Sequence, residues 1–154
     1  MITIRNYKNS DAETLRSIHF NTIHNINTRD YTKEQLDAWA PASIDKEFWQ
    51  ERFKGLSPFV AQINETIVGY TDLQNNGLID HFFCHHRYQG KGIGRKLMTH
   101  VLSLAKERGI KRLYSEVSIT ARPFYEHFGF HLEKEQVFEI RGQKLKNFVM
   151  EKFI

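Results

Sequence analysis

The sequence contains only one cysteine, Cys84, among its 154 residues. A single thiol cannot form a disulfide within the chain, which is typical of proteins from a reducing compartment. No apolar run approaches the roughly 18 residues that are needed to cross a bilayer. The residues from Met1 to Arg5 also lack the charged start and the long apolar middle of a secretory signal. We therefore expect a cytoplasmic protein that has no membrane partner.

A concentration of charge of one sign is also absent. The formal net charge is +4 and the Lys and Arg residues are scattered along the chain, whereas nucleic-acid-binding surfaces gather basic residues into a patch. We expect no nucleic-acid partner, and a small polyanion remains compatible with this charge. Internal repeats, linkers and low-complexity segments are missing too, and the length suits one hydrophobic core. We predict a single domain over residues 1–154.

Hydrophobic spacing and turn residues predict an α+β fold. Short polar turns at residues 64–66 and 75–77 join three consecutive strands into an antiparallel meander, and a turn at 141–143 joins the last two strands. Two capping signals, Ser10 to Glu13 and Thr32 to Gln35, begin helices in the first third of the chain. The expected strands are residues 2–5, 59–63, 67–73, 78–84, 111–117, 136–140 and 145–153, and the other expected helices are residues 45–53, 92–108 and 121–128.

The segment Gln89-Gly90-Lys91-Gly92-Ile93-Gly94 lies between an expected strand and an expected helix. Its three glycines leave backbone N–H groups uncovered, and the helix start adds a partial positive charge, so the loop can hold a phosphate or pyrophosphate. Two common glycine motifs do not fit. A P-loop needs Ser or Thr where Arg95-Lys96 follows, and a dinucleotide fingerprint needs a third glycine where Arg95 or Leu97 stands.

The loop instead resembles the Gln-x-x-Gly-x-Gly signature of the GNAT superfamily of acyl-CoA-dependent N-acetyltransferases. A later segment, Ala121 to Phe130, is similar to the family pattern Ala-x-x-Phe-Tyr-x-x-x-Gly-Phe. The resemblance implies a mixed, mostly antiparallel sheet of about seven strands with flanking helices. It also implies that the strand ending at Cys84 and the strand 111–117 splay apart, and that acetyl-CoA is the co-substrate.

The same resemblance implies the cofactor-binding residues. The backbone of the loop would hold the pyrophosphate of coenzyme A, and the pantetheine arm would pair with the free edge of the strand that ends at Phe83 and Cys84. Ser118 stands where many family members have asparagine. Cys84 as an acyl-carrying nucleophile is an alternative, beside its plainer interpretation as a small buried hydrophobe. The implied set is Phe83, Cys84, Gln89, Gly90, Lys91, Gly92, Ile93, Gly94, Arg95 and Ser118.

Two catalytic residues are expected. Tyr125 matches the family tyrosine near the coenzyme A sulfur, and a phenol with a pKa of about 10 can donate a proton to a departing thiolate with a pKa of about 8.5. The base must accept a proton from the amine. Strand alternation places Asp80 on the face of Phe82 and Cys84 and opposite His81. Members of the family often have a Glu or His base on that face, so the resemblance implies Asp80, acting directly or through a water, as our candidate.

The expected reaction is direct acetyl transfer from acetyl-CoA to a primary amine in a ternary complex, without a metal. Tyr31, Trp39 and Trp49 of the early helices are candidates for an aromatic wall around the amine. Two alternatives stay open: a non-catalytic sensor that binds acyl-CoA, and an acetyltransferase whose acceptor is a protein or a charged tRNA. The oligomeric state also stays open between a monomer and a homodimer.

Overall fold

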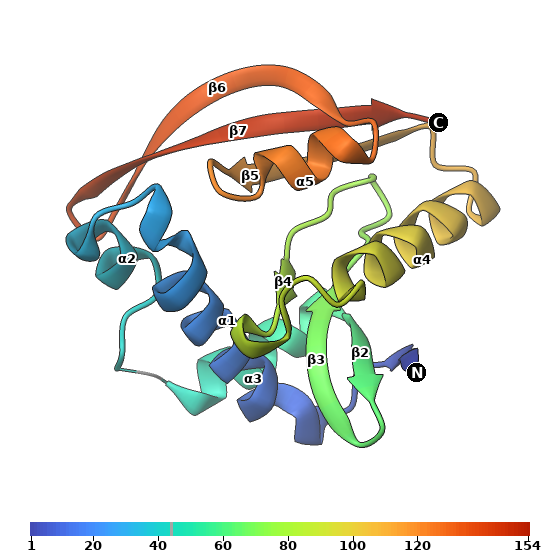
Figure 1. Cartoon of the computed structure of the whole chain (residues 1–154), viewed down its shortest axis with the longest axis horizontal. Coiled ribbons are helices and arrows are strands. Elements are labelled where there is room, and N and C mark those ends of the chain that lie inside the picture. The colour runs from blue at the N-terminus through green and yellow to red at the C-terminus, as the bar shows by residue number, and fades with distance from the viewer. Residues whose placement is uncertain (44) are drawn as a thin grey trace.

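The computed structural model describes residues 1–43 and 45–154. These residues form an α+β fold (Figure 1). The strands are β1 (Ile2–Asn6), β2 (Phe59–Ile63), β3 (Thr66–Thr71), β4 (Phe82–Cys84), β5 (Arg112–Ser118), β6 (His131–Ile140) and β7 (Gln143–Phe153). The helices are α1 (Ala12–Ile26), α2 (Lys33–Trp39), α3 (Lys46–Leu56), α4 (Ile93–Glu107) and α5 (Arg122–His127), with 3-10 turns at Asn9–Asp11, Asn27–Arg29 and His86–Tyr88.

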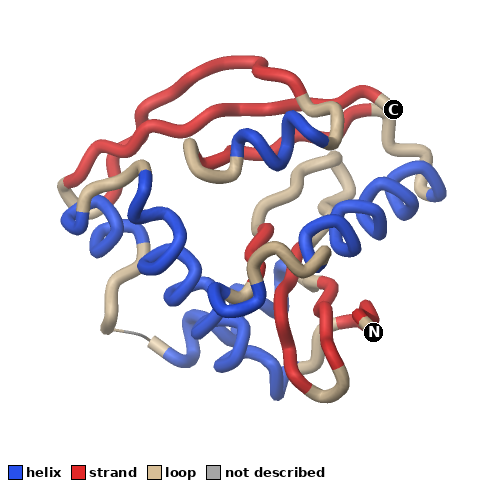
Figure 2. The backbone as a smooth tube through the Cα atoms, in the orientation of Figure 1, coloured by secondary structure: helices blue, strands red, loops and turns tan. Residues whose placement is uncertain are grey.

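The strands form two antiparallel sheets, in the orders β1-β2-β3-β4 and β5-β7-β6. The sheets meet at one isolated parallel bridge between Leu78 and Tyr114, where the N–H of Ile79 donates to the carbonyl of Tyr114 at 2.9 Å. Beyond this bridge β4 and β5 diverge, as Figure 2 shows. The predicted fold class, with seven strands and a splayed pair, is confirmed.

Helices cover the first sheet. Leu15 of α1 and Phe53 of α3 pack with Tyr70 in one buried cluster. Ile93 and Leu97 of α4 pack in another with Ala61, Val68 and neighbouring strand residues. Helix α4 therefore begins against the sheet, which fixes the preceding glycine loop beside the end of β4. In the part of the chain that is described, no helix is both long and apolar enough to span a bilayer.

Of the two expected capping boxes, one forms and the other does not. The Thr32 hydroxyl accepts from the N–H of Gln35 at 3.1 Å, and the Gln35 side chain accepts from the N–H of Thr32, which confirms the capping box. The expected box at Ser10 does not form. Ser10 lies within a 3-10 turn, and the carboxylate of Asp11 accepts from the N–H of Lys8 at 2.8 Å instead, held in place by an ion pair with Arg5.

The strand expected at residues 78–84 was predicted too long, because only Phe82–Cys84 pairs as β4. The buried carboxylate of Asp72 accepts from the N–H groups of Asp80 and His81, at 3.0 and 2.6 Å. The Thr71 hydroxyl donates to the carbonyl of His81 at 2.8 Å. The side chains of Asp72 and Thr71 thus form hydrogen bonds with backbone groups that would otherwise pair with a neighbouring strand. Residues 79–81 therefore form an irregular segment.

Candidate active site

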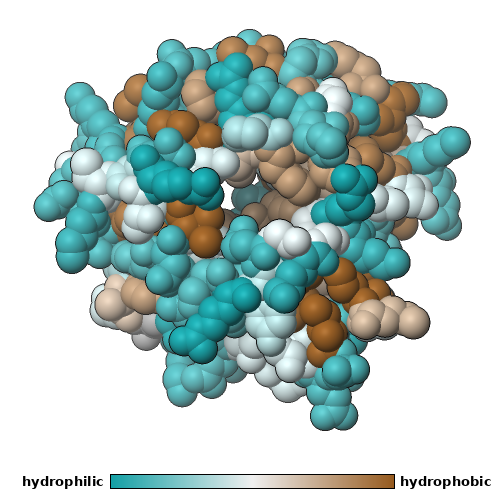
Figure 3. All heavy atoms as spheres, in the orientation of Figure 1, coloured by the Kyte–Doolittle hydropathy of each residue, from teal (hydrophilic) through white to brown (hydrophobic). Residues whose placement is uncertain are grey.

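A cavity of about 700 Å³ lies where the two sheets part. It is lined by parts of α1, β4, the glycine loop, β5, α5 and β7, and Figure 3 shows the hollow near the middle of this face. The structure brings all but one of the predicted site residues to the cavity, the exception being Lys91. The predicted residues that line it are Asp80, Phe83, Cys84, Gln89, Gly90, Gly92, Ile93, Gly94, Arg95, Ser118 and Tyr125.

The edge of β4 that faces the gap is identified by its register. The N–H of His85 donates to the carbonyl of Val68 on β3 at 2.8 Å. Since backbone groups alternate along an antiparallel strand, those of Phe83 face β3 and those of Phe82 and Cys84 face the gap. The carbonyl of Cys84 is occupied there by the Thr22 hydroxyl of α1 at 2.8 Å. The N–H groups of Phe82 and Cys84 are the donors that this edge presents.

The glycine loop leads into α4 with an open concave backbone. Gly90 and Gly92 have φ angles of 72° and 83°, in the left-handed region that favours glycine, and a Cβ at either position would meet no atom within 4 Å. A Cβ at Gly94 would lie 2.8 Å from Cε1 of Phe124 on α5. The first turn of α4 carries no acidic residue, so its positive end is unopposed within that turn.

Side chains near the loop take up different positions. The amide of Gln89 donates to the carbonyls of Cys84 and His85, at 3.0 and 3.3 Å, and so fastens the loop to the end of β4. Lys91 is exposed. The guanidinium of Arg95 lies 5.7 Å from the centre of the Phe128 ring. Of Lys91 and Arg95, it is Arg95 that lines the cavity.

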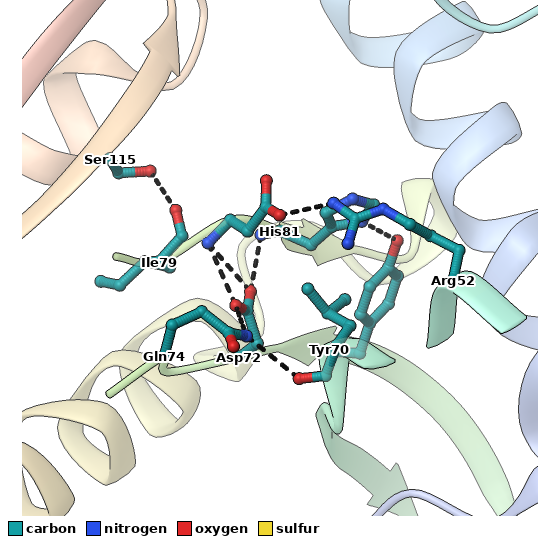
Figure 4. Close-up of polar contacts among 9 residues, drawn as sticks. Arg52, Tyr70, Asp72, Gln74, Ile79, His81 and Ser115 are labelled. Carbon is teal, nitrogen blue, oxygen red and sulfur yellow. Dashed lines mark hydrogen bonds and ion pairs between the residues drawn. The ribbon is translucent and has the colours of Figure 1, made fainter. Parts of the chain in front are cut away.

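Tyr125 is buried, with 3% of its surface exposed, and lines the cavity. Its hydroxyl lies 3.4 Å from Oγ of Ser115. Ser115 in turn donates to the carbonyl of Ile79 at 2.7 Å, as Figure 4 shows. Burial raises the pKa of Tyr125 above its ordinary value of 10, and the Ser115 contact opposes this only in part. The phenol therefore stays protonated at neutral pH and is available as a donor.

Ser118 and Cys84 are both held by the surrounding structure. The Ser118 hydroxyl accepts from the N–H of Ala121 at 3.0 Å and so shapes the turn into α5. Burial raises the pKa of the Cys84 thiol to about 12. A thiol with this pKa is not ionised at neutral pH, which disfavours Cys84 as an acyl-carrying nucleophile.

Asp80 lies on the irregular segment before β4 and is exposed. Its carboxylate forms an ion pair with Arg52 of α3. We expected Asp80 and His81 on opposite faces of a strand, but neither belongs to β4, and both line the cavity. The alternation rule holds only inside a strand, and β4 begins after His81.

Two histidines that the sequence did not mark as a pair meet beside the cavity. The rings of His19 on α1 and His81 stack at 5.5 Å, and the hydroxyl of Tyr70 is 2.9 Å from Nδ1 of His81 (Figure 4). Desolvation by burial lowers the pKa of each imidazole to about 3, so both are neutral at pH 7. The signal for His19 was present, because it follows Leu15 by four residues on the buried side of α1.

Below His81, Asp72 is fully buried. Burial raises the pKa of Asp72 to about 6. Hydrogen bonds from Gln74 and from the N–H groups of His81 and Asp80 oppose this rise (Figure 4).

Among the described residues, no group of three or more His, Cys, Asp or Glu side chains is arranged to hold a metal ion.

The expected aromatic wall is split between two cavities. Tyr31 and Trp39 line the large cavity, with ring centres 5.7 Å apart, whereas Trp49 lines a smaller one. Tyr31 also bridges elements, because its hydroxyl donates to the carbonyl of Lys146 at 2.6 Å and accepts from the N–H of Ile119 at 3.0 Å. Asn147 of β7 lines the large cavity too, and its Oδ1 is buried with no hydrogen-bond partner in the described part of the chain.

A split sheet, a glycine loop at a helix start and a buried tyrosine beside the gap are the features that the resemblance to the GNAT superfamily predicts. Comparisons with known proteins agree. The family model "Acetyltransferase (GNAT) domain" matches residues 27–152. The "Uncharacterized N-acetyltransferase YafP" of Escherichia coli strain K12 is 32% identical over 149 residues, which are 97% of this chain and 94% of YafP. The chain belongs to the GNAT acetyltransferase family.

Solved structures show the same fold. A GCN5-related N-acetyltransferase from Rhodopseudomonas palustris superposes with a TM-score of 0.93 at 28% identity, over 99% of this chain and 95% of that one. The protein yncA from Salmonella typhimurium, solved with its cofactor acetyl-CoA, has a TM-score of 0.73 at 18% identity, over 99% of this chain and 94% of yncA.

Proposed function

We propose that the protein transfers the acetyl group of acetyl-CoA to a primary amine by direct attack in a ternary complex. One observation carries the proposal: the glycine loop, the free edge of β4 and the protonated hydroxyl of Tyr125 all border one cavity. Family membership and the acetyl-CoA found in a protein of the same fold support the choice of donor.

The donor would lie along the gap between the sheets. The N–H groups from Gly90 to Arg95 would hold the pyrophosphate at the positive end of α4. The pantetheine arm would take the place of a missing strand beside β4, using the N–H groups of Phe82 and Cys84. Ser118, across the gap on β5, would offer its hydroxyl proton to the same arm, since Ala121 already donates to the oxygen.

In the chemical step, the amine nitrogen attacks the thioester carbonyl carbon. A C–N bond forms, the C–S bond breaks and the nitrogen releases a proton to water, so the products are the N-acetyl amine and coenzyme A with its thiol. An N–H of the β4 edge would stabilise the oxyanion, and Tyr125 would protonate the departing sulfur. The phenol then regains a proton from solvent.

The amine must first be neutral. For an ordinary ammonium with a pKa near 10.4, reaching the neutral form at pH 7 costs about 4.6 kcal/mol. Asp80 would accept this proton, directly or through a water. The Arg52 ion pair engages Oδ2 of the carboxylate, so the second oxygen is the one assigned to this role.

Calorimetry with acetyl-CoA and a thiol-release assay over a panel of amines test the proposal. We expect acetyl-CoA to bind and at least one amine to release coenzyme A stoichiometrically with N-acetyl product. Absence of acetyl-CoA binding would refute the proposal. Binding without thiol release from any amine would instead assign the protein to the non-catalytic sensors.

A further inference from the structure

A second cavity of about 340 Å³ adjoins the large one. Four side chains line both cavities and form their common boundary: His19, Trp39, His81 and Ile140. Asp80, which directly precedes His81 in the sequence, lines the large cavity. The smaller cavity is thus placed to hold the remainder of an acceptor whose amine lies near Asp80.

Three arginines from separate parts of the chain converge on the smaller cavity. They are Arg16 of α1, Arg52 of α3 and Arg141 of the β6–β7 turn. Arg52 donates to Asp80, and Nη1 of Arg141 donates to the carbonyl of Ala38 at 2.7 Å. A guanidinium carries five N–H donors, so each of these two retains donors for a ligand.

The carboxylates of both cavities are engaged within the protein. Asp45 lines the smaller cavity and accepts from the N–H groups of Glu47 and Phe48 at the start of α3. In the large cavity, Asp80 is paired with Arg52 and Glu116 accepts from Gln136 at 3.0 Å. Among the described residues, Arg16, Arg52 and Arg141 face two carboxylates, Asp45 and the Asp80 that pairs with Arg52, which leaves one net positive charge at the smaller cavity. Such a field favours an anion over a polycation.

Aromatic side chains also line the smaller cavity. Phe20, Trp39, Phe48 and Trp49 line it, and the rings of Phe48 and Trp49 meet edge to face at 5.6 Å. Apolar faces beside guanidinium groups are suited to a ligand that has an apolar body and an oxyanion.

We propose that the acceptor is a primary amine that also carries an oxyanion, a carboxylate or a phosphonate, on an apolar body. This inference rests on the proposed function and names its acceptor class. The oxyanion binds among Arg16, Arg52 and Arg141, the body lies against Trp39 and the neighbouring aromatic rings, and the amine reaches past the boundary toward Asp80. Polycationic amines such as spermidine are poor acceptors, since the arginines repel their second ammonium.

Matched amines test this assignment with saturating acetyl-CoA. Phenylalanine and 4-(aminomethyl)benzoate are compared with their carboxamides, which keep the amine and the body but lack the charge, with 4-(aminomethyl)benzenephosphonate, and with spermidine. We expect kcat/KM to be at least about tenfold higher for an acid than for its amide. The phosphonate arm decides which oxyanion is preferred. Equal rates for acids and amides, or the highest rate with spermidine, overturn the assignment.

Arginine variants locate the effect. In Arg16→Gln and Arg141→Gln, KM for the preferred acid should rise about tenfold, with KM for its amide and the acetyl-CoA affinity unchanged. Lys54→Gln is the control, because it removes one positive charge from exposed α3 surface that lines neither cavity. Equal effects of all three variants overturn the assignment, since only the net charge would then matter.

Binding without turnover separates this inference from the proposed function. Calorimetry titrates the same acids and amides into the protein saturated with coenzyme A. If acids bind, amides do not, and no amine releases thiol, the anion site stands and the acetyltransferase proposal fails. The anion site is refuted if the acids do not bind and are also turned over no faster than their amides. This conclusion holds whatever the activity toward other amines.

Discussion

Arg52 and Asp80 form an ion pair that joins the two cavities, because Arg52 lines the smaller one and Asp80 the larger. The two residues come from α3 and from the irregular segment before β4. Because a guanidinium carries five N–H donors, Arg52 can hold the carboxylate of Asp80 and still present donors to an acceptor oxyanion. The ion pair thus links the proposed anion site to the carboxylate that we assign as the base.

Asp80→Asn tests that assignment. The amide can keep a hydrogen bond to Arg52 but cannot accept a proton, so kcat should fall about 100-fold, while calorimetry finds the acetyl-CoA affinity nearly unchanged. A variant that keeps the kcat of the unmodified protein would exclude Asp80 as the base.

Tyr125→Phe separates catalysis from packing. The ring stays among Phe82, Phe124 and Phe130. Within the described part of the chain, the hydroxyl loses one hydrogen bond, the long one to Ser115. We expect kcat to fall about 100-fold or more, with the acetyl-CoA dissociation constant changed less than about threefold. If affinity and turnover fall together, Tyr125 serves the structure rather than the reaction.

Gly92→Ala and Gly109→Ala form a matched pair. Both glycines have positive φ, 83° and 70°, with no atom within 4 Å of an added Cβ, so each substitution should cost about 1 kcal/mol of unfolding free energy. Only Gly92 lies in the loop assigned to the pyrophosphate. Calorimetry should therefore find weaker acetyl-CoA binding for Gly92→Ala alone, and equal weakening by both would argue against the loop as the phosphate site.

The parts of the site that could be predicted from sequence are those encoded by neighbouring residues. The glycine loop and the segment around Tyr125 are short local patterns, and each lies at the cavity. Asp72 determines the path of Asp80 and His81 from eight and nine residues away. That contact exists only once the chain has folded, and local patterning therefore predicted too long a strand.

The second cavity could not be predicted from local sequence patterns at all. Arg16, Arg52 and Arg141 are isolated arginines in sequence, without a motif that joins them. In sequence alone they are indistinguishable from solvated surface charges. Their convergence depends on how α1, α3 and the β6–β7 turn pack together, and residue spacing does not contain that information.

Acid should destabilise the protein through His19 and His81. Their pKa values are lowered to about 3 in the folded state, against about 6.5 in the unfolded chain. The stability linked to them is complete above pH 6.5 and is lost as the pH falls toward 3, because the unfolded state takes up protons first. Between pH 6.5 and 4.5 the two histidines together lower the free energy of unfolding by about 5 kcal/mol.

Asp72 acts in the opposite direction over the same range. Its folded pKa of about 6 exceeds the unfolded value near 3.9, so protonation on acidification favours the folded state by about 2 kcal/mol. Urea unfolding should find a net loss of about 3 kcal/mol in the unmodified protein. The loss should be larger in Asp72→Asn and smaller in His19→Leu. Equal stability at pH 6.5 and 4.5 in the unmodified protein would contradict the assignment of two neutral buried histidines.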